Sequence, residues 1–192
     1  MKLYIKNMAC DCCKLLVKDE IEKLGLQPVN IDLGEAEIKG TVTDKQQEKL
    51  NDAIQEAGLE LVVSKKGILL EKIKKNIYQY VHESSEKQRI SFSNYLIKHL
   101  PYDYAYLANF FSEMQATTIE QYLIALKIDK VKELIVLRDL TLTEIADKLH
   151  YSSVAHLSAQ FKKVTGLTPT HFKKLKEDRK KIIKGIDEQQ IK

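Results

Sequence analysis

The sequence predicts an α+β protein in which a small antiparallel sheet with two helices, residues 1–66, precedes an all-helical part, residues 67–183. Two observations lead to this prediction. Before residue 64, short segments alternate apolar and polar residues as half-buried strands do, whereas from Ile68 onward apolar residues recur at helical spacing. The chain also has only three prolines and seven glycines, as is typical of a helix-rich globular protein.

The first part switches between strand-like and helix-like segments. Four strand-like segments lie at residues 3–5, at 29–33, around Ile38 and at 59–63. Two helical segments lie between them: one carries Leu15, Leu16, Ile21 and Leu24 and stops at Gly25, and the other is capped by Thr43 and carries Leu50, Ala53, Ile54 and Ala57. The order β-α-β-β-α-β folds as one antiparallel sheet with both helices on one face, the ferredoxin-like arrangement.

The strongest local signal of the helical part is Thr141–Lys163. Thr141 and Glu144 have the spacing of a capping box that starts a helix. After a short turn, Ser152 is expected to cap a second helix, with Leu157 and Phe161 pointing back at the first. Two short helices joined in this way make a helix-turn-helix, whose second helix enters the major groove of DNA. The candidate DNA-contacting residues of this second helix are Ser153, Val154, Ala155, His156, Ser158, Ala159, Lys162 and Lys163.

These residue types favour a particular way of reading DNA. Lys162 and Lys163 suit phosphates, and His156 and Ser158 supply polar groups for base edges. The small apolar residues touch thymine methyl groups without hydrogen bonding, so DNA shape would carry much of the specificity. A solvated surface histidine is the alternative interpretation of His156. The tyrosines are expected to be core and turn packing rather than a base-stacking platform, at positions 95, 102, 104, 106 and 122.

Charge divides unevenly along the chain. Residues 1–67 hold ten Lys against twelve Asp and Glu, a net charge of −2, whereas residues 68–192 hold 21 Lys and Arg against 15 acids, a net charge of +6. A basic part favours a polyanionic partner, because contacts to phosphates release counterions. A solvated basic surface is the alternative.

Several motifs in the helical part resemble the signature of the AraC/XylS family. They are Ile145-Ala146, Tyr151-Ser152-Ser153, Phe161-Lys162-Lys163 and Gly166-Leu167-Thr168-Pro169. The resemblance covers about residues 68–176 and implies an AraC-type DNA-binding domain, in which two helix-turn-helix units are joined by a long helix, here Ile119–Leu137. It also implies a transcription regulator whose partners are double-stranded operator DNA and, as a further candidate, RNA polymerase.

The first helix-turn-helix departs from the family pattern. Its helices are expected at Phe92–His99 and Tyr104–Met114, with base-facing positions at Ala105, Ala108, Asn109 and Ser112. Relatives commonly carry Phe-Lys-Lys where this chain has Phe111-Ser112-Glu113. Residues 90–123 contain one Lys against three acids, whereas residues 141–176 contain six Lys against two acids. We therefore expect the second helix-turn-helix to supply most of the attraction to DNA.

Three cysteines, Cys10, Cys12 and Cys13, lie together at the expected start of the first helix. They cannot form the disulfide framework of a secreted protein, because they lie within four positions. Cys10 and Cys13 have C-x-x-C spacing at a helix start, where the dipole favours thiolates, and two thiolates suit Cu(I). A redox pair and an inert remnant remain open alternatives. Cys12 is interpreted as a passive loop residue, with a third ligand or a competing disulfide partner left open.

Residues 1–65 resemble the heavy-metal-associated domain of copper chaperones and metal-transport ATPases. The family motif Met-x-Cys-x-x-Cys is matched by Met8, Cys10 and Cys13, and Glu56-Ala57-Gly58-Leu59 resembles the end of its second helix. This resemblance implies Cu(I), or another soft metal, at Cys10 and Cys13.

The leading interpretation is a sequence-specific transcription regulator that responds to a metal or thiol signal at the cysteines. The runner-up is a copper chaperone or buffer with a helical docking module. An enzyme is not expected, because no Ser/His/Asp order, phosphate-binding glycine loop or paired carboxylates stand out; a thiol oxidoreductase using Cys10 and Cys13 is the only version to test. No apolar run approaches about 18 residues and no signal peptide is evident, so we expect a cytoplasmic protein that does not enter membranes. Residues 184–192 are expected to form a polar tail.

Overall fold

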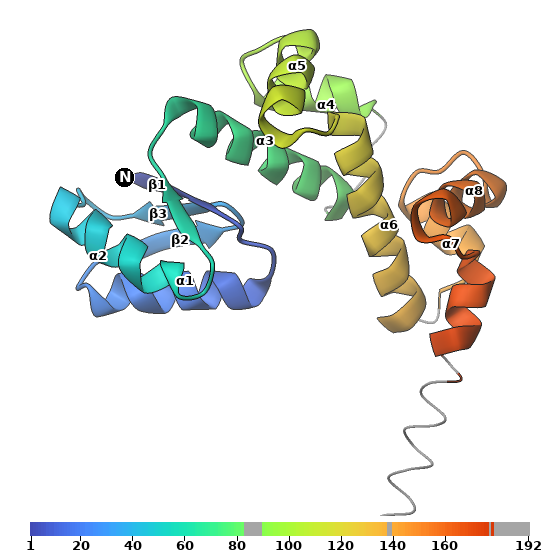
Figure 1. Cartoon of the computed structure of the whole chain (residues 1–192), viewed down its shortest axis with the longest axis horizontal. Coiled ribbons are helices and arrows are strands. Elements are labelled where there is room, and N and C mark those ends of the chain that lie inside the picture. The colour runs from blue at the N-terminus through green and yellow to red at the C-terminus, as the bar shows by residue number, and fades with distance from the viewer. Residues whose placement is uncertain (83–89, 138–139, 177, 179–192) are drawn as a thin grey trace, which may run out of the picture. The chain divides into compact units, whose positions relative to one another are not determined.

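The computed structural model in Figure 1 describes residues 1–82, 90–137, 140–176 and 178. Its contacts divide the chain into two compact units, Met1–Ile77 and Tyr78–Lys192, here called the N-terminal and C-terminal units. The helix α3 (Lys65–His82) contributes residues to both. The domain boundary that we expect at residues 66–67 lies near the start of this helix and stays a prediction. The expected tail, residues 184–192, lies outside the described residues.

The N-terminal unit has the predicted β-α-β-β-α-β order. Its elements are β1 (Lys2–Lys6), α1 (Asp11–Lys23), β2 (Pro28–Asp32), β3 (Glu35–Ile38), α2 (Asp44–Gln55) and β4 (Glu60–Val62). The strands form one sheet in the order β2-β3-β1-β4, and each neighbouring pair is antiparallel. In Figure 1 both α1 and α2 cover the same face of this sheet. The predicted ferredoxin-like arrangement is therefore confirmed.

The core of the N-terminal unit lies between the sheet and these two helices. Its fully buried side chains include Ile5 of the sheet, Ile21 of α1 and Leu50 of α2. The expected stripe of α1 was wrong at Leu15, whose exposed fraction is 68%, whereas Val17 is fully buried. Residues two positions apart in a helix are rotated by about 200° around its axis. Because Val17 faces the sheet, Leu15 points away from it.

The first part of α3 belongs to the N-terminal unit and is tied to the β2–β3 hairpin. The ammonium of Lys75 lies 3.0 Å from a carboxylate oxygen of Asp32 and 3.6 Å from one of Glu35. Burial would raise the pKa of Asp32, but hydrogen bonds from Lys75 and the Leu33 amide, with the charges of Lys75 and Lys14, outweigh burial and hold that pKa below its usual value. Sequence periodicity predicted α3 but not this ionic attachment.

The C-terminal unit is helical throughout its described elements. After α3 follow α4 (Phe92–His99), α5 (Tyr104–Gln115), α6 (Ile119–Leu137), α7 (Leu142–Lys148) and α8 (Val154–Thr165), with a further helical segment at 169–176. Figure 1 shows that α6 runs from the α4–α5 pair to the α7–α8 pair, as predicted for the joining helix. Among the described residues, no helix is long and apolar enough to cross a membrane.

Candidate nucleic-acid interface and cysteine site

The second helix-turn-helix begins at a reciprocal cap. The hydroxyl oxygen of Thr141 accepts a hydrogen bond from the Glu144 amide at 3.2 Å, and the Glu144 carboxylate accepts one from the Thr141 amide at 2.7 Å. These two bonds satisfy amide groups that a helix start leaves without partners. The helix that follows, α7, buries Ile145 and Ala146. The predicted capping box is therefore confirmed.

The turn between α7 and α8 contains a residue with left-handed backbone. His150 has a φ of 54°, and the amide of Tyr151 then donates to the carbonyl of Ala146 at 2.9 Å. The left-handed conformation is sterically costly for any residue except glycine. The turn between α7 and α8 thus holds backbone strain at His150.

The cap of α8 is Ser153, so the expected cap at Ser152 was wrong. The Ser153 hydroxyl oxygen accepts a hydrogen bond from the amide of His156 at 3.0 Å. Ser152 Oγ lies 3.0 Å from Nδ1 of His156 instead. The two serines are adjacent and chemically equal, so composition alone does not distinguish the one that adopts the cap conformation.

Buried apolar side chains hold α8 against the rest of the unit. Leu157 and Phe161 are fully buried in one cluster with Ile128 of α6 and Ile145 of α7. Beside them, the buried Tyr151 donates its hydroxyl hydrogen to the side-chain oxygen of Gln160 at 2.7 Å. Burial raises the pKa of Tyr151 to about 12, so this hydroxyl remains a donor. The outward face of α8 is thereby held in a fixed orientation.

That outward face carries the residues that the sequence predicts for DNA contact. Most of them are exposed: Ser153, Ala155, His156, Ala159, Lys162 and Lys163. Val154 and Ser158 are half-buried, and Val154 packs partly against the buried cluster. The ring of His156 meets that of Tyr151 edge to face at 5.4 Å. Since Nδ1 of His156 lies against Ser152, the other ring nitrogen is the one available to a base edge.

The first helix-turn-helix has a similar cap, but its exposed side chains offer fewer groups that could contact DNA. Asp103 caps α5 by accepting a hydrogen bond from the Tyr106 amide at 2.8 Å. Of its predicted base-facing positions, Ala105 and Asn109 are exposed and Ala108 is half-buried. Ser112 donates its hydroxyl hydrogen to the Ala108 carbonyl at 2.9 Å, so this hydroxyl already has a partner within the helix.

Two of the tyrosines expected to be packing residues are exposed instead. Tyr102 and Tyr106 have exposed fractions of 44% and 46%, and their rings stack with centroids 5.1 Å apart. The expectation of packing was wrong for this pair because Tyr106 lies one position before the buried Leu107, on the outer side of α5. By contrast, Tyr95 packs on Tyr80 and Tyr122 packs on Phe111.

The residue that sequence reasoning missed in the C-terminal unit is Lys127 of α6. Its ammonium lies 5.3 Å from the ring centroid of Tyr151 and 6.0 Å from that of Tyr80. Its position, three residues after Ile124 and four before Val131, places it on the buried stripe of α6 and was the available signal.

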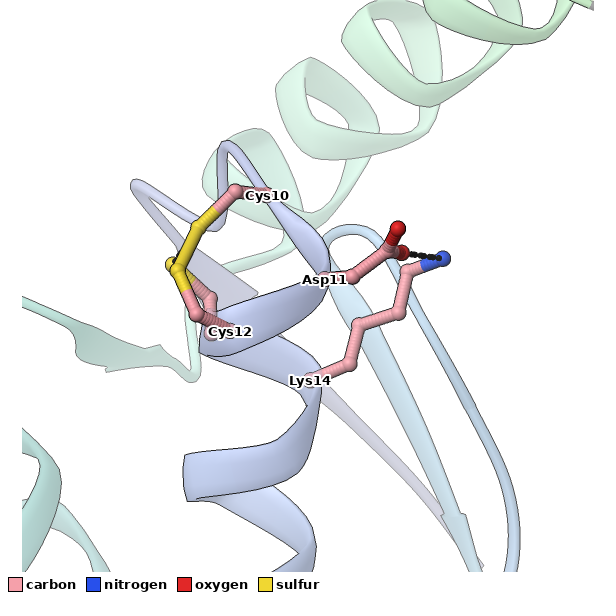
Figure 2. The surroundings of a disulfide bond; sticks show 5 residues. Cys10, Asp11, Cys12 and Lys14 are labelled. Atoms are coloured by element: carbon pink, nitrogen blue, oxygen red, sulfur yellow. Dashed lines mark hydrogen bonds and ion pairs between the residues drawn. A yellow bond between two sulfur atoms is a disulfide. The ribbon is translucent and has the colours of Figure 1, made fainter.

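The cysteine site lies where the β1–α1 loop enters α1 (Figure 2). Cys10 is disulfide-bonded to Cys12, and the free Cys13 has its sulfur 3.3 Å from that of Cys10. The interpretation of Cys12 as a passive loop residue was therefore wrong, since the competing disulfide is the one formed. The three sulfur atoms all lie within 4.8 Å of one another, and they are the only such His/Cys/Asp/Glu group in the described chain. Metal binding by Cys10 and Cys13 stays a prediction.

Comparison with known proteins concerns the helical part. A family model described as a helix-turn-helix domain matches residues 96–175. No curated protein matches the sequence. The fold of the C-terminal domain of AraT, a response regulator from Geobacillus stearothermophilus, aligns with a TM-score of 0.50 at 20% identity, over 58% of this chain and 88% of that one.

Two further solved structures have lower TM-scores. A DNA-binding transcriptional dual regulator from Escherichia coli K-12 aligns at 0.47 and 17% identity, over 55% of this chain and 93% of that one. The C-terminal domain of the two-component response regulator yesN from Fusobacterium nucleatum aligns at 0.44 and 21% identity, over 56% and 96%.

The family that matches residues 96–175 is a helix-turn-helix domain and not an enzyme family, in agreement with the prediction for this part of the chain. For residues 1–65 the ferredoxin-like sheet is confirmed, and the resemblance to the heavy-metal-associated family stays a prediction. Residues 96–175 match a helix-turn-helix domain, and their two helix pairs joined by α6 have the arrangement that the sequence motifs predict.

Proposed function

We propose that this chain is a sequence-specific transcription regulator that binds double-stranded operator DNA mainly through α8. The observation that carries the proposal is the division of α8 into two faces. One face is fixed by the fully buried Leu157 and Phe161, and the other presents His156 with exposed small residues. A recognition helix needs such a rigid, exposed face, because the major groove admits one helix and offers base edges to its N-terminal half.

The charges around α8 support binding to phosphates. Lys162 and Lys163 lie exposed at the C-terminal end of α8. The helical segment at 169–176 adds Lys173, Lys174 and Lys176. Such contacts position the protein on the duplex without reading sequence. Within the proposal, His156 and Ser158 contact base edges, while Ala155 and Ala159 contact thymine methyl groups.

The first helix-turn-helix is proposed to be the weaker DNA reader. Asn109 is its exposed amide, the residue type that pairs with adenine in the major groove. Because Ser112 donates within α5, its hydroxyl proton is not free for DNA. Asp103 and Glu113, both exposed, oppose the approach of phosphates.

We further propose that the N-terminal unit receives a thiol or soft-metal signal at its cysteines. The donor set supports this, because sulfur ligands select soft ions such as Cu(I). Cys10 and Cys13 would hold Cu(I) once the bond from Cys10 to Cys12 is reduced, since their sulfurs already lie 3.3 Å apart. A bound Cu(I) would offset one of the two thiolate charges at the start of α1.

The test is selection of bound duplexes from a random pool, at two salt concentrations, with or without Cu(I), and with the protein reduced or oxidised. A regulator enriches one sequence motif at both salt concentrations, whereas phosphate attraction alone gives binding that weakens with salt and a flat pool. A flat pool would contradict the proposed regulator. A flat pool together with tight Cu(I) binding would favour the copper chaperone or buffer instead. A motif whose enrichment depends on Cu(I) supports metal signalling, and enrichment that ignores both Cu(I) and reduction contradicts it.

A further inference from the structure

We propose that Cys10, Cys12 and Cys13 together form a redox-gated site for a trivalent thiophilic ion, which the Cys10–Cys12 disulfide closes and reduction opens. The inference deepens the thiol-responsive role proposed above and rests on it only for any effect on DNA binding. It differs from the two-sulfur Cu(I) site in its third ligand, Cys12, and in the class of ion.

Once the Cys10–Cys12 bond is reduced, the three sulfurs are close enough together to bind one ion. Cys10 and Cys13 have their sulfurs 3.3 Å apart, and all three sulfurs lie within 4.8 Å of one another. With a metal–sulfur bond of about 2.3 Å, sulfurs at right angles around one ion lie about 3.3 Å apart. Trivalent ions with a lone pair, such as As(III), bind three thiolates in such a pyramid, and three thiolates neutralise their charge.

The backbone makes the three side chains converge. Cys10 is the N-cap residue of α1 and makes no side-chain capping bond, so its sulfur is not engaged with the helix amides. The amide of Cys13 donates to the carbonyl of Cys10 at 3.1 Å, which closes one turn around the cysteines. Cys12 is exposed, and Cys10 and Cys13 are half-buried, so a small ion or reductant reaches the site.

The carboxylate nearest in sequence points away from the sulfurs. Figure 2 shows Asp11 on the opposite side of the helix start, where it pairs with Lys14 at 3.1 Å. The ligand set is therefore sulfur alone, which disfavours the hard ions that prefer oxygen.

The gate follows from the chemistry of the disulfide. While Cys10 and Cys12 are bonded, Cys13 is the one remaining thiol of the three. A dithiol reductant transfers two electrons and two protons to this bond, giving two cysteine thiols and the cyclic disulfide of the reductant. The three thiols then condense with arsenite, As(OH)3: three As–O bonds break, three As–S bonds form, and each hydroxide leaves as water with one thiol proton.

Exchange inside the triad moves the disulfide but leaves the site closed. The Cys13 thiolate attacks the adjacent Cys10 sulfur, the Cys10–Cys13 bond forms, and the Cys10–Cys12 bond breaks. The electron pair leaves on the sulfur of Cys12, which takes up the proton that Cys13 lost. Every disulfide isomer leaves one thiol, so any oxidised form lacks the three-sulfur set.

The experiment titrates the full chain, in its reduced and oxidised forms, with arsenite and separately with Cu(I) against a competing chelator. Native mass spectrometry counts bound ions, and arsenic X-ray absorption counts sulfur neighbours. We expect one arsenic per reduced chain with three sulfur neighbours, and none on the oxidised chain. Cys12→Ser should weaken arsenic binding by about a hundredfold or more and leave Cu(I) binding nearly unchanged. Asp11→Asn is the control and should bind like the wild type.

The inference is overturned if C12S binds arsenite as tightly as the wild type, or if the oxidised chain binds it equally well. Circular dichroism of each variant separates loss of a ligand from loss of the fold. The outcome is independent of the DNA selection. If the chain binds arsenic but enriches no DNA motif, the ion site is upheld and the proposed regulator is contradicted. If the chain enriches a motif but binds no arsenic, the regulator is upheld and the ion site is contradicted.

Discussion

The ammonium of Lys127 in α6 donates a hydrogen bond to the carbonyl oxygen of Leu149, 3.0 Å away at the end of α7. The donor thus satisfies a carbonyl that the helix end would otherwise leave without a partner. The same ammonium faces the rings of Tyr151 and Tyr80. Lys127 therefore fastens the long joining helix to the turn of the second helix-turn-helix.

Replacing Lys127 by methionine should destabilise the C-terminal unit. Methionine keeps the apolar stem but cannot donate to Leu149, and the loss of a hydrogen bond from a charged group costs about 2 kcal/mol. Urea unfolding measures the change. Lys132→Met is the control: Lys132 lies on the same helix but pairs with Asp129 at the surface, and its loss should change the unfolding free energy little.

The effect of Lys127 should also depend on pH. Burial lowers the pKa of Lys127 below its ordinary 10.5, so the unfolded chain holds this proton more strongly than the folded chain. The unfolding free energy of the wild type, relative to K127M, should therefore rise as pH increases from the lowered pKa towards 10.5. A difference that stays constant or falls over this range would contradict the burial of a charged ammonium.

His150→Gly should stabilise the turn between α7 and α8. With a φ of 54°, His150 occupies the left-handed region, which costs a residue with a Cβ about 1 kcal/mol or more. Glycine relieves that strain, so thermal or urea unfolding should show a gain of about 1 kcal/mol, reduced by the greater freedom of glycine in the unfolded chain. His150→Ala keeps the Cβ and should show no such gain. Equal stability of H150G and H150A would show that the turn is not strained.

Thr141→Ala should lower the unfolding free energy by about 1 kcal/mol, the usual cost of losing a hydroxyl N-cap. Thr143→Ala, an exposed position inside α7, is the matched control and should not destabilise. If both variants unfold like the wild type, the cap contributes nothing.

The same cap should make the unfolding free energy depend on pH in the acid range. Hydrogen bonds from the Thr141 amide and hydroxyl lower the pKa of Glu144 below its ordinary 4.5. The stabilisation by this carboxylate is therefore present above pH about 4.5 and is lost as pH falls through the lowered pKa. Glu144→Gln should remove that portion of the acid sensitivity, which unfolding measured between neutral pH and pH 3 would reveal.

Lys162→Gln combined with Lys163→Gln should weaken binding to all duplexes alike. If both side chains contact phosphates, the slope of log affinity against log salt should become less negative by about 1.8. Lys49→Gln, an exposed change in α2, should leave the slope unchanged. A double variant with the wild-type slope would place these lysines away from the DNA.

The sequence predicted most of the fold because its signals are local. Alternating apolar residues predicted the sheet of the N-terminal unit, and the family resemblance placed α4 and α6 with the bounds that the structure shows. Interactions set by tertiary context escaped prediction. Spacing alone did not decide which two of three adjacent cysteines would bond, and a lysine inside a helix, such as Lys127, normally faces water.

The candidate interface was likewise predictable only where local sequence determines it. Helical period placed His156 on the outer face of α8 correctly. It did not predict the Ser152 and Tyr151 contacts that orient its ring, because these depend on the backbone of the turn. The choice of Ser153 over Ser152 as cap depends on that same backbone.

The most direct test of the central claim combines His156→Ala with single-base changes in the selected duplex. Dissociation constants of wild type and H156A are measured for the selected site and for each substituted site. If α8 reads the major groove through His156, the wild type should discriminate at one base pair by about 1–3 kcal/mol, and H156A should lose that discrimination while keeping the others. An H156A protein that discriminates like the wild type at every position would contradict the account.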